Sequence, residues 1–139
     1  MPGSVGWREY WARDEFWLNS DTWKLNAEIF LRRSAPWIDF QSSDTVLTVG
    51  CGAGHLEAML APRVERLHVV DTSERYLEIC ARRCEPFKNV TVQRLGERYT
   101  DLSKCPGSFS RILSVSVVQY YKQMHEIAEL IRSARSVAR

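Results

Sequence analysis

Three glycines and one aspartate are the residues whose types and spacing point most directly to chemistry. The glycines alternate with other residues across 50–54 (GCGAG), between a β-branched stretch and the start of a helical pattern. Such a turn lets a ligand approach the backbone without a Cβ in the way. Asp71 follows a second apolar stretch, 21 residues after Gly50. Its carboxylate can accept hydrogen bonds from both hydroxyls of a ribose, and it can also cap the helix that follows.

The glycine spacing distinguishes this turn from two better-known phosphate-binding turns. A dinucleotide-binding turn requires its third glycine at position 55, which is His55 here. A phosphate-binding P-loop requires a lysine, and the turn contains none. The pattern is therefore Gly-x-Gly-x-Gly, which disfavours a nicotinamide-dependent enzyme.

The elements that must position these residues alternate between strand and helix. The β-branched stretch before the turn and the apolar stretch before Asp71 lack polar alternation, as expected of strands buried on both faces. A third segment alternates and belongs nearer a sheet edge. This order predicts an α/β fold with a doubly wound, mainly parallel sheet and helices on both faces. We predict strands at 45–49, 67–70, 90–95 and 112–115, and helices at 55–60, after Ser73 and from about Gln123.

The first forty residues differ from the rest of the chain because they contain all five tryptophans. A helical pattern begins at Ser20 or Asp21, and a shorter helix is predicted over 7–17. These aromatic residues either cover one face of the core or form a lid over a ligand. We therefore divide the chain into a helical leader or lid, 1–40, and a ligand-binding domain, 41–139.

Composition excludes several classes of protein. The chain has 139 residues, enough for one domain, with 45% apolar and 26% charged residues and a net charge of +2. That charge gives no strong nucleic-acid signal. No run of 18 apolar residues and no signal peptide occur, so we expect no membrane partner and a cytoplasmic location.

The cysteines and histidines give no sign of a metal centre. Cys51 and His55 supply only two of the four ligands that a zinc site needs, so we predict none. Cys80 and Cys84 lie four apart in the apolar stripe of a predicted helix, where core packing is expected. His68, in a buried strand, is expected to be a hydrogen-bonded core residue.

From Asp44 onward the chain resembles the class I, seven-stranded, Rossmann-like methyltransferases that depend on S-adenosylmethionine. The resemblance rests on TVLTVGCGAGHL (45–56), LHVVDTSERYLEICARR (67–83), NVTVQRLGERY (89–99) and FSRILSVSVVQYY (109–121). It implies S-adenosylmethionine as the cofactor. It further implies cofactor contacts from Gly50, Cys51, Gly52 and Gly54 in the turn, Asp71 on the ribose, Thr72 against the adenine, Glu97 near the adenine amino group, and Ser114 and Val115 beside the sulfonium centre.

Two features depart from the family pattern. Family members commonly carry an acid where this chain has Thr48. The family's sheet has seven strands, whereas four are predicted here, which leaves an incomplete fold and a fourth strand with unpaired backbone groups. We interpret the chain as a fragment, or as one part of an assembly or oligomer that completes the sheet.

The sequence thus predicts an S-adenosylmethionine-dependent methyltransferase whose acceptor is not identified by any residue pattern. The leader aromatics and Tyr120 are the candidates for the acceptor side. The alternative is a non-catalytic cofactor-binding or assembly module with the same fold, which Thr48 and the early end of the chain favour.

Overall fold

The computed structural model describes residues 6–13 and 21–139. Its centre is a four-stranded sheet in the order β3-β2-β1-β4, and every neighbouring pair of strands is parallel. The predicted α/β class with a parallel, incomplete Rossmann-like sheet is confirmed. The strands are β1 (Thr45–Val49), β2 (Arg66–Asp71), β3 (Val90–Arg94) and β4 (Arg111–Leu113).

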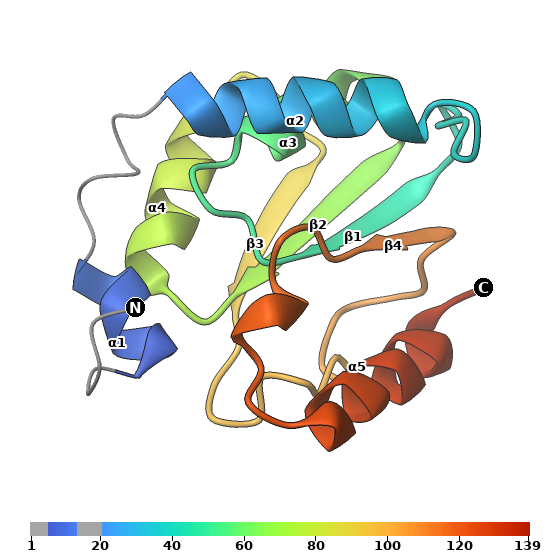
Figure 1. Cartoon of the computed structure of the whole chain (residues 1–139). Coiled ribbons are helices and arrows are strands. Elements are labelled where there is room, and N and C mark those ends of the chain that lie inside the picture. Colours follow the sequence, from blue (N-terminus) through green and yellow to red (C-terminus); the bar gives the residue numbers. More distant parts are fainter. Residues whose placement is uncertain (1–5, 14–20) are drawn as a thin grey trace.

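Helices cover both faces of this sheet, as the alternating pattern predicts. Figure 1 shows α2 and α5 on opposite sides of it. The helices are α1 (Trp7–Arg13), α2 (Asp21–Ser34), α3 (His55–Leu60), α4 (Glu74–Arg83) and α5 (Met124–Val137), with short 3₁₀ turns at Ala61–Arg63 and Val118–Tyr120.

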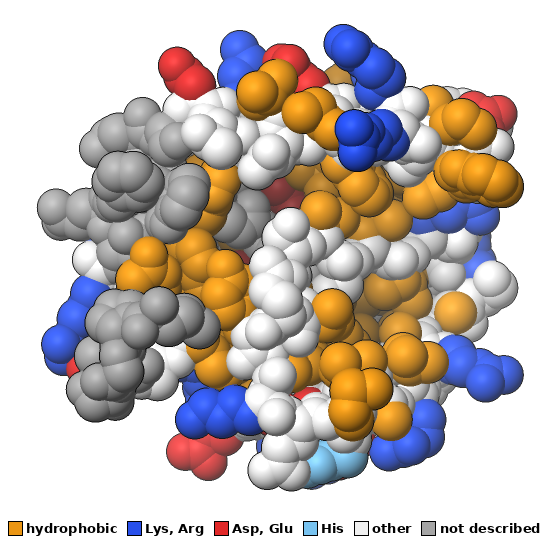
Figure 2. Space-filling view, in the orientation of Figure 1, with side chains coloured by type: hydrophobic (Ala, Val, Ile, Leu, Met, Phe, Trp, Pro, Cys, Tyr) orange, Lys and Arg blue, Asp and Glu red, His pale blue; other side chains and the backbone are white. Residues whose placement is uncertain are grey.

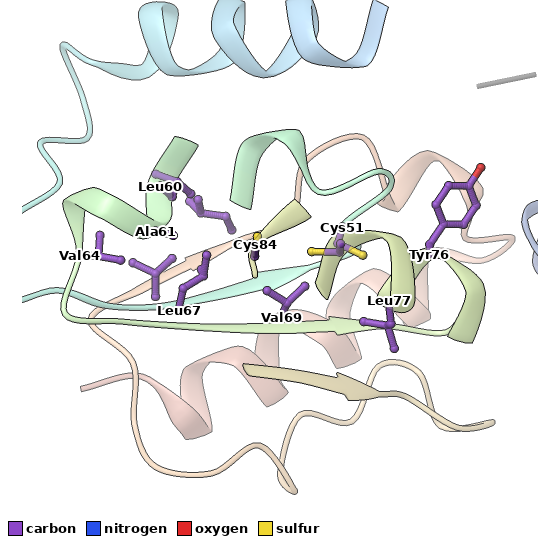
Figure 3. Packing of buried hydrophobic residues seen from close by; sticks show 12 residues of the cluster. Cys51, Leu60, Ala61, Val64, Leu67, Val69, Tyr76, Leu77 and Cys84 are labelled. Carbon is purple, nitrogen blue, oxygen red and sulfur yellow. The ribbon is translucent and has the colours of Figure 1, made fainter. Parts of the chain in front are cut away.

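The central strand β1 divides the core into two clusters, because its side chains alternate between the faces. Val46 packs with residues of α3 and α4, whereas Leu47 and Val49 pack with residues of α5. Figure 3 shows the first cluster. The residues labelled there are Cys51, Leu60, Ala61, Val64, Leu67, Val69, Tyr76, Leu77 and Cys84.

Several core predictions are confirmed. His68 is buried, and its ring nitrogens lie 2.6 Å from Thr91 Oγ1 and 2.8 Å from Gln93 Oε1. Cys80 and Cys84 are buried in the cluster of Figure 3. The alternating third strand, β3, lies at one edge of the sheet.

The other edge of the sheet is β4, which is shorter than predicted. It ends at Leu113, so Ser114 and Val115 lie beyond the strand. The backbone changes direction there, since Ser116 has a left-handed φ of 59°. No further strand pairs with β4 among residues 6–13 and 21–139.

The described parts of the leader contain two helices, followed by a turn and irregular backbone over 35–40. The first helix, α1, ends at Arg13, and the rest of the predicted helix over 7–17 lies outside the described residues. The second, α2, begins at Asp21, one of its two predicted starts; the other, Ser20, is not among the described residues. No helix in the described ranges has the length and apolar character needed to cross a membrane.

Candidate functional site

The glycine turn connects β1 to α3 in backbone conformations that favour glycine. Gly50, Gly52 and Gly54 have φ angles of 83°, 49° and 78°. A Cβ on Gly54 would lie 2.7 Å from the Cα atom of Cys80, so glycine allows the turn to approach α4 closely. The left-handed φ angles of its glycines therefore set the conformation of the turn, and packing against α4 sets its position.

Asp71 ends β2 directly beside this turn. Its Oδ2 accepts a hydrogen bond from the amide of Cys51 at 2.9 Å, and its Oδ1 accepts one from the amide of Ser73, also at 2.9 Å. Ser73 in turn caps α4 by accepting a hydrogen bond from the amide of Tyr76. Because each carboxylate oxygen has a second lone pair, Asp71 can still accept hydrogen bonds from a ligand.

A cavity of about 810 Å³ opens over the turn and the carboxyl ends of the strands. Its floor includes the glycine turn, Asp71 and Thr72, and one side is formed by the segment 115–121 that follows β4. Figure 2 shows hydrophobic side chains along this face of the molecule, below α2. The volume lies in the range of pockets that enclose most of a small ligand, and the position is where open parallel sheets bind ligands.

Aromatic side chains from distant parts of the sequence form the wall of the cavity. Trp11 of α1 lies 5.6 Å from Trp23 of α2 and 5.4 Å from Tyr120, measured between ring centroids. Trp7 packs edge-on against Tyr99 at 5.3 Å. The described aromatic side chains of the leader therefore line the cavity, and Trp11 and Trp23 also pack against the core cluster, so both the lid and the core-covering role stay predictions.

Six of the nine residues predicted to bind a cofactor line this cavity, and three do not. Gly54 is buried beneath the turn, with its α-carbon turned towards Cys80. Glu97 and Ser114 are exposed and absent from the lining. The lining residues of the predicted set are Gly50, Cys51, Gly52, Asp71, Thr72 and Val115. The role of all nine toward a cofactor stays a prediction.

Glu57 also lines the cavity, and sequence reasoning missed it. It lies in the first turn of α3 with an exposed fraction of 1%, and its Oε2 has no hydrogen-bond partner among the described residues. Burial raises the pKa of this carboxyl to about 8. In the sequence the residue looks like an ordinary helix-surface glutamate, so no pattern could have singled it out.

Two other titratable groups at the turn are held neutral. His55 starts α3 and lines the cavity, and burial together with Arg83 and Lys24 lowers its pKa. A contact from the Cys80 thiol lowers the pKa of Cys51, but burial and the carboxylates of Asp71 and Glu57 raise it to about 12. In the described ranges, no group of three or more His, Cys, Asp or Glu side chains could hold a metal ion.

Comparison with protein families gives one match. A family model described as a methyltransferase domain matches residues 46–139, about two thirds of the chain. That range contains all of β1 but its first residue, the glycine turn, Asp71 and α5. No curated protein matches the sequence.

Solved structures share the fold at low sequence identity. N-methyltransferase NodS from Bradyrhizobium japonicum, in complex with S-adenosylhomocysteine, is 18% identical with a TM-score of 0.74, over 95% of this chain and 66% of that one. Phosphoethanolamine N-methyltransferase 1 from Haemonchus contortus is 17% identical with a TM-score of 0.76, over 96% of this chain and 28% of that one. A dimethyladenosine transferase from Plasmodium falciparum is 24% identical with a TM-score of 0.60, over 77% of this chain and 36% of that one. The chain thus spans between 28% and 66% of the length of these three proteins.

Proposed function

Because this chain belongs to the methyltransferase-domain family, we propose that it is the cofactor-binding part of an S-adenosylmethionine-dependent methyltransferase. The observation that carries the proposal is the Asp71 carboxylate, hydrogen-bonded to the amide of Cys51 on the floor of a cavity of about 810 Å³. The methyl acceptor is not identified by the residues of the site.

The side chains around the cavity fit this cofactor. Asp71 offers acceptor atoms for the two hydroxyls of the ribose. Thr72 and Leu95, next to it in the lining, provide a small, mostly apolar surface for the adenine. Gly50 and Gly52 also line the cavity, with the side chains of Val117 and Trp23 packed against their α-carbons, and the amino-acid part would lie along this turn.

When bound, S-adenosylmethionine supplies a methyl group on a positively charged sulfur, which makes that methyl group electrophilic. The residues of this chain contribute by positioning and by excluding water. Trp7 and Trp11 pack against Tyr120 of the segment that follows β4, and these three rings, which line the cavity, would hold an acceptor there. Alignment of this kind can supply much of the rate enhancement without a general base.

The proposal includes a cytoplasmic location and no nucleic-acid or membrane partner. The net charge of +2 gives no electrostatic reason for either partner. It also includes the division into a leader or lid, 1–40, and a cofactor-binding domain, 41–139.

The direct test measures thermal unfolding with and without S-adenosylhomocysteine, the product form of the cofactor. At about 100 times its dissociation constant the ligand should stabilise the folded protein by about 2.7 kcal/mol. Asp71→Asn should lose most of this stabilisation, because an uncharged amide offers one acceptor oxygen where the carboxylate offers two. Asp39→Asn is the matched control, since Asp39 is exposed and precedes β1 at the other end of the sheet. A cooperatively folded wild-type protein without any shift would refute the proposal.

The alternative, a non-catalytic binding or assembly module, is supported by the open edge of β4. In that case the protein would bind S-adenosylhomocysteine and form a stable oligomer through this edge, yet transfer no methyl group. Light scattering for the mass in solution, together with transfer assays on the same sample, separates the two functions.

A further inference from the structure

The Glu57 carboxylate is a buried acid with no charge partner among the described residues. It lies at the cavity wall in the first turn of α3, with 1% of its surface exposed. Neither its Oε2 nor the buried Oγ1 of Thr48 in β1 has a hydrogen-bond partner in the part of the chain that the structure describes. A buried polar atom without a partner is costly and uncommon in native proteins, so this pair needs an explanation.

The surroundings of Glu57 supply no positive charge. Burial is the largest effect on the pKa of Glu57 and favours the protonated form, whereas its own backbone amide and the nearby Thr48 hydroxyl favour the ionised form. The thiol of Cys84 and the carboxylate of Asp71 oppose ionisation, and the thiol of Cys51 is a further neutral neighbour. In the protein without ligand the Glu57 carboxyl is therefore largely protonated at neutral pH, with a pKa of about 8.

The two unpartnered oxygens lie on the same side of the sheet, and of the two residues Glu57 lines the cavity, whereas Thr48 lies behind the lining. Thr48 has the same orientation in β1 as Val46, which packs in the cluster on the side of α3 and α4. Glu57 reaches this side from α3, directly after the glycine turn. The Glu57 carboxylate, which lines the cavity, would be satisfied by a group that carries several donors and a positive charge, and the Thr48 hydroxyl can donate a hydrogen bond to the same carboxylate.

An ammonium group has these properties, since it has three donors and no acceptor. We infer that Glu57, assisted by Thr48, binds the α-ammonium group of the amino-acid part of the cofactor. The inference rests on the proposed function, because it concerns the same cavity. Family members commonly carry an acid at the position of Thr48, near the end of β1. In this chain Glu57 would supply that negative charge instead.

The inference predicts that binding expels a proton. Glu57 is mostly protonated without ligand and ionised beside an ammonium group, so binding of S-adenosylhomocysteine at pH 7 should release about 0.9 proton per site. Isothermal titration calorimetry in phosphate and in Tris measures this number, because the two buffers differ in ionisation enthalpy. The wild-type measurement needs no variant and hence no assumption about how a variant folds.

Variants then assign the proton to Glu57. Glu57→Gln should release no proton and bind S-adenosylhomocysteine about 10- to 100-fold more weakly, because a charge-assisted hydrogen bond is lost. Its affinity for 5′-methylthioadenosine, which lacks the amino-acid part, should stay within about twofold of wild type. Glu85→Gln is the matched control, because Glu85 is exposed in the turn that follows α4. The exchange Thr48→Asp with Glu57→Thr should restore binding, since it moves the carboxylate across the same small space.

The outcomes separate this inference from the proposed function. If the wild-type protein binds neither S-adenosylhomocysteine nor 5′-methylthioadenosine, both are wrong. If it binds S-adenosylhomocysteine without releasing a proton, or if Glu57→Gln binds equally well, the ammonium subsite is wrong while the proposed function stands. If Glu57→Gln weakened the binding of both ligands equally, the inferred ammonium subsite would also be wrong, because only S-adenosylhomocysteine carries the ammonium group.

Discussion

Replacement of Gly54 by alanine tests whether close packing between the glycine turn and α4 holds the site in place. Gly54 has a φ of 78°, and an added Cβ would lie 2.7 Å from the Cα and 2.9 Å from the Sγ of Cys80. The left-handed conformation disfavours alanine by about 1–2 kcal/mol. The contact with helix backbone adds about 1–3 kcal/mol, since α4 must move as a unit.

The expected loss for Gly54→Ala is therefore about 2–5 kcal/mol of unfolding free energy, a large fraction of a typical domain's stability. Urea denaturation at constant temperature measures this loss. The slope of the unfolding free energy against urea concentration should stay unchanged, because the substitution acts on the native state. The control is Gly96→Ala, because Gly96 has no neighbouring atom within 4 Å of an added Cβ and no left-handed φ. That control should change the stability by less than about 0.5 kcal/mol.

A third variant separates the two contributions. Gly52→Ala also has a left-handed φ, of 49°, but its Cβ meets the ring of Trp23 rather than backbone. A side chain can move aside more easily than a helix, so Gly52→Ala should destabilise less than Gly54→Ala. Equal losses at the two positions would show that packing against Cys80 contributes nothing. If Gly54→Ala behaved like Gly96→Ala, the whole argument would be wrong.

Three further changes should have smaller effects. Ser73→Ala removes the cap that accepts from the amide of Tyr76, and should lower the unfolding free energy by about 1 kcal/mol in urea denaturation. Tyr99→Phe removes a hydroxyl that donates to Glu126 and whose pKa is raised to about 12 by burial and by this carboxylate. A loss of about 0.5–1.5 kcal/mol is expected in the same assay, and no loss would show that the contact is not formed in solution. Burial lowers the pKa of His68, so the unfolded chain binds a proton more readily than the folded one as the pH falls below about 6.5. Wild-type stability should therefore decline from pH 7 to pH 5 more than that of His68→Leu, and parallel curves would contradict this.

The sequence alone predicted the relation between the glycine turn and Asp71. Two apolar stretches without polar alternation require strands buried on both faces, and such strands are parallel neighbours in α/β folds. Their carboxyl ends must then meet at one edge of the sheet. The hydrogen bond of 2.9 Å between the Cys51 amide and Asp71 agrees with that prediction.

The sequence was less informative where the chain leaves the sheet. The fourth strand was predicted to include Ser114 and Val115, yet it ends at Leu113. The β-branched run continues past this point, so local propensity could not locate the end of pairing. Glu97, selected by resemblance, is exposed and outside the lining. A loop residue's direction depends on the loop path, which periodicity does not specify.

Local pattern therefore determined the elements, their order and the edge of the sheet that carries the site, because periodicity reports which faces of a segment are buried. Only the tertiary structure determined what surrounds that edge. It buries Glu57 beside Thr48, and it brings Trp7 and Trp11 against Tyr99 and Tyr120. Burial of a charged group and contact between distant aromatics depend on how elements pack against each other, and no spacing along one segment records that.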